Sequence, residues 1–430
     1  MASPGLLITP ARCLAGRVTV PGDKSISHRA FLLAALASGV SRVSGAGMGD
    51  DCRSTQACLT ALGLSFRPDP ASRTAVRIHG LGVGGLQPPS DELDAGNSGT
   101  TTRLLLGVLA GHPFPTRLTG DASLRRRPMR RILDPLERMG AAVRSSDGRL
   151  PIEIRGGALH AIDYVVPVAS AQVKSGVMLA ALHAEGTTTI AEPAPTRDHT
   201  ERMLRQFGAD VGVDDRGAIH VPGRQRLTAA EVSVPGDPSS AAFWLAAAAA
   251  LPGSDIEVQN VSLNPTRTAL LDVLRRAGAQ VDVDVTTAGP EPAGTVRVRH
   301  RALHPLTITP AEVPGLIDEI PALAAMATYG GGLSVTGAAE LRVKESDRIT
   351  DLVRGLRALG ASAAELPDGF VIDARPRLAG GAADACGDHR LAMAFAIAAL
   401  GAEGDSTIAG ADAVSVSYPG FFATLEALRR

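Results

Sequence analysis

One pattern recurs six times along the 430-residue chain, and this repeat constrains the fold more than any other feature. In each copy an Ala- and Leu-rich stretch leads to a glycine and then to a short β-branched segment, as in residues 29–39 followed by 40–43. Glycine readily adopts the left-handed conformation that closes a helix, so each stretch is predicted to be a helix ending at its glycine. The Ala-rich bodies, above all residues 241–250, are predicted to be buried on most sides. The six glycines, spaced roughly 70 residues apart, are Gly39, Gly111, Gly186, Gly253, Gly330 and Gly404.

A second, amphipathic helix is predicted between successive inner helices. Residues 349–359 show its pattern, with apolar side chains three or four positions apart. Strand-like segments follow these helices, such as residues 279–285. Each repeat is therefore predicted to hold two helices and several strands, with the sixth copy truncated near Leu428. The second helices end at Gly63, Gly140, Gly208, Gly278 and Gly360.

The length and the repeat together predict an α/β (α+β) fold in two similar lobes. Domains usually hold about 100 to 200 residues, so the six repeats are expected to divide into three per lobe. The segment at residues 20–25 has an echo at residues 234–239, and both precede an inner helix. We therefore expect residues 1–20 plus 236–430 to form lobe one and residues 21–235 to form lobe two.

Composition and charge argue against several classes of protein. The formal net charge is −1 and aromatic residues make up 3% of the chain, so neither attraction to nucleic acid nor a base-stacking surface is expected. The longest apolar run, residues 241–251, is too short to span a bilayer, and we expect a cytoplasmic protein without membrane contact. The four cysteines lack CxxC spacing and a nearby His pair, so no metal or other cofactor is expected.

Functional-looking side chains gather where the predicted inner helices begin. A helix N-terminus binds phosphate or carboxylate through its unpaired N–H groups and its dipole, and Lys or Arg strengthens that binding. Simple capping explains any single helix start equally well. Five starts nevertheless carry such residues, and only the fourth, at residues 237–240, is bland. The residues are Lys24, Ser25 and Arg29; Asn97, Gly99 and Arg103; Ser170, Gln172 and Lys174; Asp318 and Glu319; and Asp388, His389 and Arg390.

Residues 342–348 are the most informative stretch of the chain. Lys344 and Arg348 lie four positions apart with acids between them. Ser346 is expected to cap the helix predicted at residues 349–359. A surface loop rich in ion pairs is one interpretation of this stretch. Phosphate clamps and a proton donor within one turn are the interpretation we favour.

Three further places suggest chemistry. Asp318 and Glu319 cannot face the same point because neighbouring residues on a helix are about 100° apart, so one acid is expected to work and the other to cap the helix or be solvated. Arg127 comes just before Pro128, where a helix is expected to begin, and an Arg of this cluster is expected to reach an anion. His389 fits a general acid and a structural histidine equally well.

Glycine-rich segments do not support nucleotide binding. Residues 45–49 lack the G-x-G-x-x-G spacing, and residues 80–84 lead into prolines rather than a helix. Residues 22–25 have no glycine at the position that a P-loop requires. We interpret the first two segments as turns, and none of the three is expected to bind dinucleotides or ATP.

Six motifs occur in a fixed order: Gly22-Asp23-Lys24-Ser25, His28-Arg29, Asn97-Ser98-Gly99-Thr100, Arg127-Pro128, residues 342–348 and Asp388-His389-Arg390. Together they resemble the family of 5-enolpyruvylshikimate-3-phosphate (EPSP) synthases over residues 20 to about 420. The resemblance implies transfer of the enolpyruvyl group of phosphoenolpyruvate to the 5-hydroxyl of shikimate 3-phosphate, with release of phosphate, in aromatic amino-acid biosynthesis. It also implies an enolpyruvyl transferase-like, inside-out α/β barrel in two lobes, each of three units with buried inner helices.

The resemblance also implies roles for individual residues. Asp318 would accept the 5-hydroxyl proton, Glu345 would handle the methylene proton with help from Lys344, and Lys24 would touch both substrates. Lobe two would be the shikimate 3-phosphate side and lobe one the phosphoenolpyruvate side. The residues implied for shikimate 3-phosphate are Lys24, Ser25, Arg29, Ser170, Gln172, Arg197, Asp318 and Lys344. Those implied for phosphoenolpyruvate are Lys24, Asn97, Gly99, Arg127, Gln172, Arg348 and Arg390.

The chain departs from part of the family at three positions. Val416 stands where some members carry a phosphoenolpyruvate-binding Lys, Ala171 replaces a Ser, and Arg197 appears where others have a Tyr near the shikimate phosphate. These departures concern contacts to the substrates rather than the reaction. Gly99 is expected to leave room for the inhibitor glyphosate, since any side chain there would crowd the site.

Two other functions compete with this interpretation. The related enzyme that transfers enolpyruvyl to UDP-N-acetylglucosamine typically has Lys-Asn where this chain has Lys24-Ser25, and its reactive loop Cys has no counterpart placed in this sequence. A non-enzymatic scaffold of repeated helices would need no convergent cations. We expect the protein to be a monomer with small-molecule substrates.

Overall fold

The computed structural model describes residues 5–374 and 377–430. Within them the chain divides into two compact units: unit 1 runs up to Pro21 and again from Pro235 to Arg430, and unit 2 runs from Gly22 to Val234. The predicted lobes placed these divisions after residues 20 and 235.

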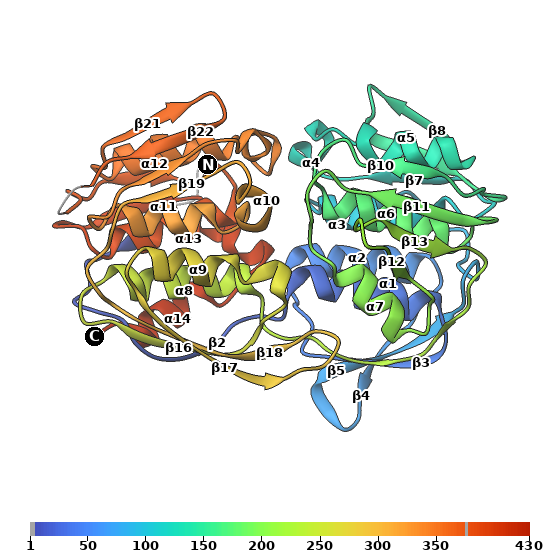
Figure 1. Ribbon diagram of the computed structural model, residues 1–430, viewed down its shortest axis with the longest axis horizontal. Helices are drawn as coiled ribbons and strands as arrows, with labels where there is room; N and C mark the ends of the chain where they lie inside the picture. The colour runs from blue at the N-terminus through green and yellow to red at the C-terminus, as the bar shows by residue number, and fades with distance from the viewer. Residues whose placement is uncertain (1–4, 375–376) are drawn as a thin grey trace. The chain divides into compact units, whose positions relative to one another are not determined.

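Unit 2 contains three small sheets (Figure 1). The first has the order β14 (Leu227–Thr228), β3 (Ala37–Ser44), β5 (Ser72–Leu81), β4 (Phe66–Asp69), and β15 (Glu231–Ser233) also pairs with β3. The second is β6 (Leu93–Asp94), β7 (Thr116–Thr119), β9 (Arg149–Arg155), β8 (Ala142–Ser146), and the third is β10 (Asp163–Val165), β11 (Thr187–Ala191), β13 (Ile219–Pro222), β12 (Gly212–Val213). The inner helices are α1 (Lys24–Leu36), α3 (Gly99–Leu109) and α6 (Ala171–Ala181). The other helices are α2 (Asp50–Ala61), α4 (Ala122–Arg126), α5 (Arg130–Met139) and α7 (His199–Gln206).

Unit 1 contains three more sheets. They are β17 (Gln280–Thr287), β18 (Ala293–Arg299), β16 (Asp255–Ser262), β2 (Ala15–Thr19); β19 (Leu306–Ile308), β20 (Leu333–Val335), β22 (Gly369–Ile372), β21 (Ala363–Leu366); and β1 (Leu6–Ile8), β24 (Ser406–Ala409), β23 (Ala382–Asp384). The inner helices are α8 (Pro238–Ala250), α11 (Ile320–Ala327) and α13 (His389–Ala399). The other α-helices are α9 (Ala269–Arg276), α10 (Val313–Leu316), α12 (Arg348–Ala358) and α14 (Phe421–Leu428), and the 3-10 helices are η1 (Pro265–Arg267), η2 (Ala339–Val343) and η3 (Ala411–Val416).

The six sheets match the six copies of the sequence repeat. Five of them share one connectivity, in which a parallel pair of strands is followed by two antiparallel neighbours, as in β6, β7, β9 and β8. In the sixth sheet β23 and β24 form the parallel pair, and β1 from the start of the chain takes the antiparallel place. The parallel partner of β16 is likewise the early strand β2. Each sheet is therefore mixed, and two sheets of unit 1 are completed by the N-terminal segment.

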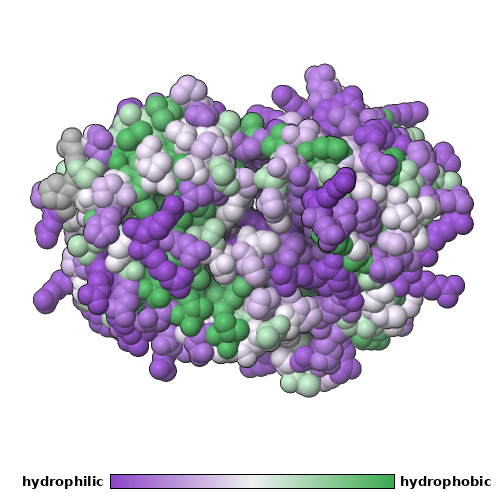
Figure 2. All heavy atoms as spheres, in the orientation of Figure 1, coloured by the Kyte–Doolittle hydropathy of each residue, from purple (hydrophilic) through white to green (hydrophobic). Residues whose placement is uncertain are grey.

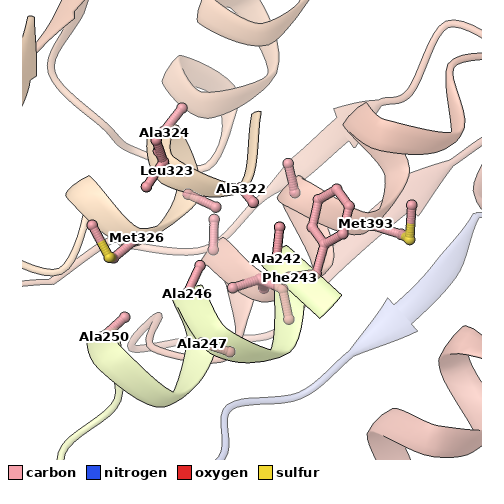
Figure 3. Packing of buried hydrophobic residues seen from close by; sticks show 14 of the residues in the cluster. Ala242, Phe243, Ala246, Ala247, Ala250, Ala322, Leu323, Ala324, Met326 and Met393 are labelled. Carbon is pink, nitrogen blue, oxygen red and sulfur yellow. The ribbon is translucent and has the colours of Figure 1, made fainter. Parts of the chain in front are cut away.

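The inner helices form the centre of each core. Every residue of α8 is buried, as predicted for its Ala-rich sequence. Figure 3 shows Ala242 and Ala246 of α8 directed toward α11, the helix that carries Ala322 and Met326. Short alanine side chains let the helix backbones approach closely, and α11 packs against both α8 and α13. The outer helix α12 instead buries one stripe of apolar side chains, which confirms the amphipathic pattern predicted for residues 349–359.

The helix-closing glycines differ from the prediction. At the outer helices the glycines do take the left-handed conformation, with φ between 83° at Gly208 and 112° at Gly140. Among the inner helices the prediction was wrong at α1, because that helix ends before its glycine. Helix α1 stops at Leu36, its C-cap Ala37 is already extended, and Gly39 lies within β3. Helix α1 turns directly into a strand, so no left-handed residue is needed at its end.

Hydrophilic side chains are plentiful over both units on the face shown in Figure 2, and hydrophobic side chains appear there in scattered patches. The exposed large hydrophobic residues include Val165 and Val285 on strands β10 and β17. Within the described residues, 5–374 and 377–430, no helix combines the length and apolar character needed to cross a bilayer.

Two histidines packed in unit 2 give the fold an expected pH dependence. The rings of His112 and His183 lie 5.2 Å apart, and burial, helped by His112, lowers the pKa of His183 from 6.5 to about 3. Below pH 6.5 the imidazole of His183 is therefore protonated in the unfolded chain but neutral in the folded chain. The free energy of unfolding falls as pH drops from 6.5 toward 3. The loss approaches about 1.4 kcal/mol per pH unit for this group.

We expect His183→Phe to flatten that dependence. Urea unfolding at pH 7, 6 and 5 would show wild type losing more stability than the variant across this interval. Replacing the exposed His79 by Phe provides a control that should keep the wild-type slope. Equal slopes for wild type and His183→Phe would show that His183 protonates freely in the folded state.

Candidate active site

The first inner helix of unit 2 begins with a buried ion pair. Asp23 is its N-cap and accepts a hydrogen bond from the backbone N–H of Ile26. Lys24 follows, and its Nζ lies 2.6 Å from Oδ2 of Asp51 in the first turn of α2. The side chains of Lys24 and Asp51 are 18% and 8% exposed, respectively, so the lysine is held in one direction while still reachable by a ligand.

Arg29, one turn further along α1, ties three helices together. Its Nε donates to Oγ1 of Thr200 on α7 at 2.6 Å, and its Nη2 donates to Oγ of Ser175 on α6 at 2.7 Å. Its Nη1 donates to the carbonyl of Ser25 at 2.8 Å. Ser25 and Arg29 are therefore adjacent, and three neutral oxygens hold the guanidinium in place.

The second inner helix places Asn97 beside Arg127. Ser98 caps α3. Just before it, Oδ1 of Asn97 accepts a hydrogen bond of 2.5 Å from Nη2 of Arg127. Nδ2 of Asn97 donates one of 2.5 Å to Oδ2 of Asp121. Arg127 is 7% exposed. The expected helix start at Pro128 is wrong, because Arg127 is the C-cap of α4 and α5 begins at Arg130. The break at Pro128 aims Arg127 toward the start of α3.

Gly99 and Gln172 meet at a second arginine. Oε1 of Gln172 accepts a hydrogen bond of 2.7 Å from Nη1 of Arg103, and its Nε2 donates to Oγ1 of Thr100 at 2.8 Å. A Cβ added at Gly99 would lie 2.8 Å from Nη1 of Arg103 and 3.4 Å from Nη1 of Arg127. The Arg103 guanidinium therefore approaches the backbone more closely than a Cβ would allow, whereas Arg127 would be in ordinary van der Waals contact with it.

We expect Gly99→Ala to weaken anion binding at this point. The added methyl group is too close to Arg103, so that flexible side chain must move, while Arg127 can stay in contact with the methyl group. Steady-state kinetics should show a higher KM for phosphoenolpyruvate and a higher glyphosate concentration for half inhibition. Gly212→Ala, on an exposed strand of unit 2 where the added Cβ would lie 3.8 Å from Cβ of His220, controls for a glycine change away from these arginines. Unchanged inhibition in Gly99→Ala would contradict the expected glyphosate contact.

The third inner helix carries Ser170 as its N-cap and a buried lysine behind it. Lys174 is 1% exposed, and its Nζ lies 2.8 Å from carboxylate oxygens of both Glu192 and Glu201. Glu192 also accepts a hydrogen bond from Thr196, next to the half-buried Arg197. Lys174 therefore anchors the loop that presents Arg197 rather than acting as an accessible anion-binding residue.

Arg348 is the centre of the polar cluster in unit 1. It is 1% exposed, and its Nε donates to Oδ2 of Asp388 at 2.7 Å. Its Nη2 donates to Oε2 of Glu345 at 2.5 Å, and its Nη1 lies 3.5 Å from Oδ1 of Asp318. Nη1 of Arg390 donates to the backbone carbonyl of Asp318 at 2.9 Å. The cluster thus joins the starts of α11, α12 and α13.

Lys344 lies at the edge of this cluster. Burial lowers the pKa of its ammonium group, and the nearby Arg348 lowers it too, whereas Asp318 and Glu345 raise it. The cluster therefore combines three cations, Lys344, Arg348 and Arg390, with the three carboxylates of Asp318, Glu345 and Asp388. An anionic ligand entering here would compete with the carboxylates for the same cations.

Two expectations for residues 342–348 need correction. The N-cap of α12 is Asp347, whose Oδ1 accepts from Ile349 and Thr350, and not Ser346. Arg342 pairs with Asp347 and Glu365 and donates to the carbonyls of Leu366 and Pro367, so it stabilises the local loop. An aspartate at this position can accept from two N–H groups at once, which the serine one residue earlier does not do.

The fourth helix start, expected to be bland, contains a buried ion cluster. Asp237 caps α8, and Nη2 of Arg267 lies 3.3 Å from Oδ1 of Asp237 and 2.7 Å from Oγ of Ser239. Glu319 was expected to cap a helix or be solvated, but it is 1% exposed and accepts hydrogen bonds from Ser239 and Arg267. Residues far apart in sequence compensate the charge of Glu319, which is why it can be buried.

Several residues of these clusters were not predicted from the sequence. Asp51 reads as an ordinary acid in a first helical turn, Asp121 as a cap, and Arg267 as one arginine among many. One unused signal is the rarity of lysine, since only three of the 43 Lys and Arg residues are lysines. Those three, Lys24, Lys174 and Lys344, all lie in the clusters described above.

The two groups of side chains are suited to binding anions and moving protons. Unit 2 presents Lys24, Arg29, Arg103 and Arg127 near helix N-termini, and unit 1 presents three cations with carboxylates that can exchange protons. Across the described part of the chain, no group of three or more His, Cys, Asp or Glu side chains is arranged to hold a metal ion.

Comparison with known proteins gives matches over nearly the whole chain. Residues 8–425 match the model of the family EPSP synthase (3-phosphoshikimate 1-carboxyvinyltransferase). The 3-phosphoshikimate 1-carboxyvinyltransferase of Desulforamulus reducens is 48% identical over 420 residues, covering 97% of each chain. That of Acidithiobacillus ferrooxidans is 51% identical over 418 residues, covering 96% of this chain and 95% of its own.

Solved structures match equally broadly. An EPSP synthase from Acinetobacter baumannii superposes with a TM-score of 0.87 at 41% identity, covering 99% of this chain and 98% of its own. The enolpyruvyl transferase NikO from Streptomyces tendae matches with a TM-score of 0.80 at 20% identity, covering 100% and 98%, which shows a shared fold. These matches confirm the mixed α/β fold and the resemblance inferred from the motifs.

Proposed function

This chain belongs to the EPSP synthase family and is a 3-phosphoshikimate 1-carboxyvinyltransferase of the shikimate pathway, and we propose that the cations of unit 2 and the cluster around Arg348 in unit 1 carry out its reaction. The substrates are phosphoenolpyruvate and shikimate 3-phosphate. The observation that carries this assignment is that Asp318, Glu345, Arg348 and Arg390, expected to act together, lie in one cluster of unit 1.

Shikimate 3-phosphate is assigned chiefly to unit 2. Ser25 and Arg29 are adjacent, and Ser170 stands at the N-terminus of α6, where free N–H groups favour a phosphate. Arg197 is presented by the loop anchored through Lys174. Lys24 and Gln172 are assigned to the same substrate, as are Asp318 and Lys344 of unit 1.

Phosphoenolpyruvate is assigned to two sets of cations. In unit 2 the set is Lys24 and Arg127, with Asn97, Gly99 and Gln172 completing the surroundings. In unit 1 it is Arg348 and Arg390. The two substrates together carry two phosphates and two carboxylates that repel one another strongly, and the cations of these two sets offset this repulsion. Val416 offers no cation, so Lys24 and the arginines must neutralise phosphoenolpyruvate without a charge from that position.

The chemistry follows as addition and elimination. The 5-hydroxyl oxygen bonds to C2 of phosphoenolpyruvate as Asp318 takes its proton, and the methylene carbon C3 gains a proton from Glu345. In the resulting tetrahedral intermediate C3 then returns a proton to Glu345 as phosphate leaves C2, which restores the double bond, and the departing phosphate takes the proton from Asp318. Phosphoenolpyruvate binding to Arg348 would displace Glu345 from its ion pair and leave it able to carry the proton, with Lys344 beside it.

We also propose that the sheets of each unit enclose its inner helices as an inside-out α/β barrel. The complete burial of both α8 and α13 supports this arrangement, because helices surrounded on all sides need no polar face. Unit 1 would then be the phosphoenolpyruvate lobe and unit 2 the shikimate 3-phosphate lobe.

A phosphate-release assay tests the proposed substrates. The enzyme is incubated with phosphoenolpyruvate plus shikimate 3-phosphate, and in parallel with phosphoenolpyruvate plus UDP-N-acetylglucosamine. We expect phosphate release only with the first pair. Release only with the sugar nucleotide would assign the chain to the alternative reaction, and no release with either pair would favour a scaffold.

A further inference from the structure

Asp318 and Glu319 are consecutive acids with opposite environments. Asp318 has a side chain that is 16% exposed and lies 3.5 Å from Nη1 of Arg348 and 3.6 Å from Nε of Arg390. The side chain of Glu319 is 2% exposed and turned toward the start of α8. Since neighbouring residues near a helix start point about 100° apart, fixing one of these side chains restricts the direction of the other.

Glu319 is fixed by a cluster that the catalytic proposal does not use. Its Oε1 accepts a hydrogen bond from Oγ of Ser239 and lies 3.4 Å from Nη2 of Arg267. Arg267, in η1, is itself 3% exposed and bound to Asp237 at the N-cap of α8. Helices α8 and α11 are neighbours in the core of unit 1 (Figure 1). The contact therefore joins the start of α11 to a rigid partner.

The charges make this contact hard to rearrange. Glu319 and Arg267 are almost inaccessible to water, so a rotation of either side chain would leave a buried charge without compensation. Oε2 of Glu319 has no hydrogen-bond partner among the described residues, so the carboxylate depends on the contacts of Oε1. Catalytic groups must be held to within about half an ångström, and such precision requires supporting residues of this kind.

We propose that Glu319 and Arg267 are positioning residues that orient Asp318 toward its substrate proton. This inference rests on the proposed function, in which Asp318 takes the 5-hydroxyl proton. Neither Glu319 nor Arg267 contacts substrate in this proposal, and both act through the conformation of residues 318 and 319.

Glu319→Gln tests the proposal with minimal change in shape. The amide oxygen can still accept from Ser239, but the charge that holds Arg267 is gone. A misplacement of about 1 Å can cost about 100-fold in rate, so we expect kcat to fall roughly 10- to 100-fold with little change in either KM. Arg267→Lys, which keeps the charge, should retain more activity than Arg267→Met. Glu312→Gln, which breaks a surface pair with Arg276, is the matched control and should behave as wild type.

A double-mutant cycle separates positioning from general stabilisation. If Glu319 acts through Asp318, then Glu319→Gln should have no further effect on kcat in an Asp318→Asn background. The same fall in both backgrounds, or wild-type kcat in Glu319→Gln alone, would overturn the proposal. Near-normal turnover in Asp318→Asn alone would instead refute the proposed role of Asp318, so the two failures are distinguishable.

A second variant keeps the test valid if Glu319→Gln does not fold. Ser239→Ala removes one hydroxyl donor to Glu319 without burying an unpaired charge, and its folding can be checked by thermal unfolding. We expect a smaller fall in kcat, again absent in the Asp318→Asn background. Unchanged kcat in folded Ser239→Ala would then overturn the proposal.

Discussion

Asp318→Asn should lower kcat by roughly 10²- to 10⁴-fold, the usual contribution of a positioned general base. The amide keeps the size of the side chain and can still accept hydrogen bonds, but it cannot take the proton of the 5-hydroxyl. Arg348 would keep its contacts with Asp388 and Glu345, so the cluster should stay folded. Both KM values should therefore change much less than kcat. Steady-state phosphate release with each substrate varied in turn measures kcat and the KM for each substrate.

Asp272→Asn provides the control for this prediction. Asp272 also belongs to unit 1 and pairs with an arginine, but its side chain is 76% exposed and it is not among the residues assigned to the substrates. The control should turn over like wild type. Turnover of Asp318→Asn within a few-fold of the control would remove Asp318 from proton transfer and would leave Glu345 as the acid and base of the reaction.

The sixfold repeat allowed the fold to be predicted from the sequence. Buried inner helices leave a clear signature, because a helix such as α8 can use alanine at nearly every position when all sides face the core. The exact helix ends were less predictable. Gly39, near the end of α1, looked like a cap, yet the strand begins two residues earlier, at Ala37. Local sequence cannot show whether a glycine closes a helix or lies in the following strand.

The motifs identified the site residues but not their partners. Residues 342–348 and 388–390 are close in sequence to recognisable helix starts, so their place could be anticipated. Glu319 contacts Ser239 across 80 positions and Arg267 across 52. Such pairs depend on how two repeats pack, and no local pattern encodes them. The fourth helix start appeared bland for this reason, since its cation comes from η1.

Lys24→Gln should raise the KM for phosphoenolpyruvate roughly 10- to 100-fold. A hydrogen bond to a charged group contributes about 1.5–3 kcal/mol, and each 1.4 kcal/mol corresponds to a tenfold change in affinity. Glutamine can still donate a hydrogen bond to Asp51 but supplies no positive charge to the substrates. The KM for shikimate 3-phosphate should rise as well, because Lys24 is assigned to both. Initial rates over a matrix of both substrate concentrations measure these changes.

Lys24→Arg distinguishes charge from geometry at the same position. Arginine keeps the charge, but its planar fork differs from the compact ammonium group that lies 2.6 Å from Asp51. We expect the KM for phosphoenolpyruvate to fall between those of wild type and Lys24→Gln. Arg130→Gln, which removes a surface cation paired with Asp134 and Glu137, controls for charge loss elsewhere in unit 2. If Lys24→Gln binds phosphoenolpyruvate as tightly as this control, Lys24 stabilises the start of α1 through Asp51, and the arginines alone hold the substrate.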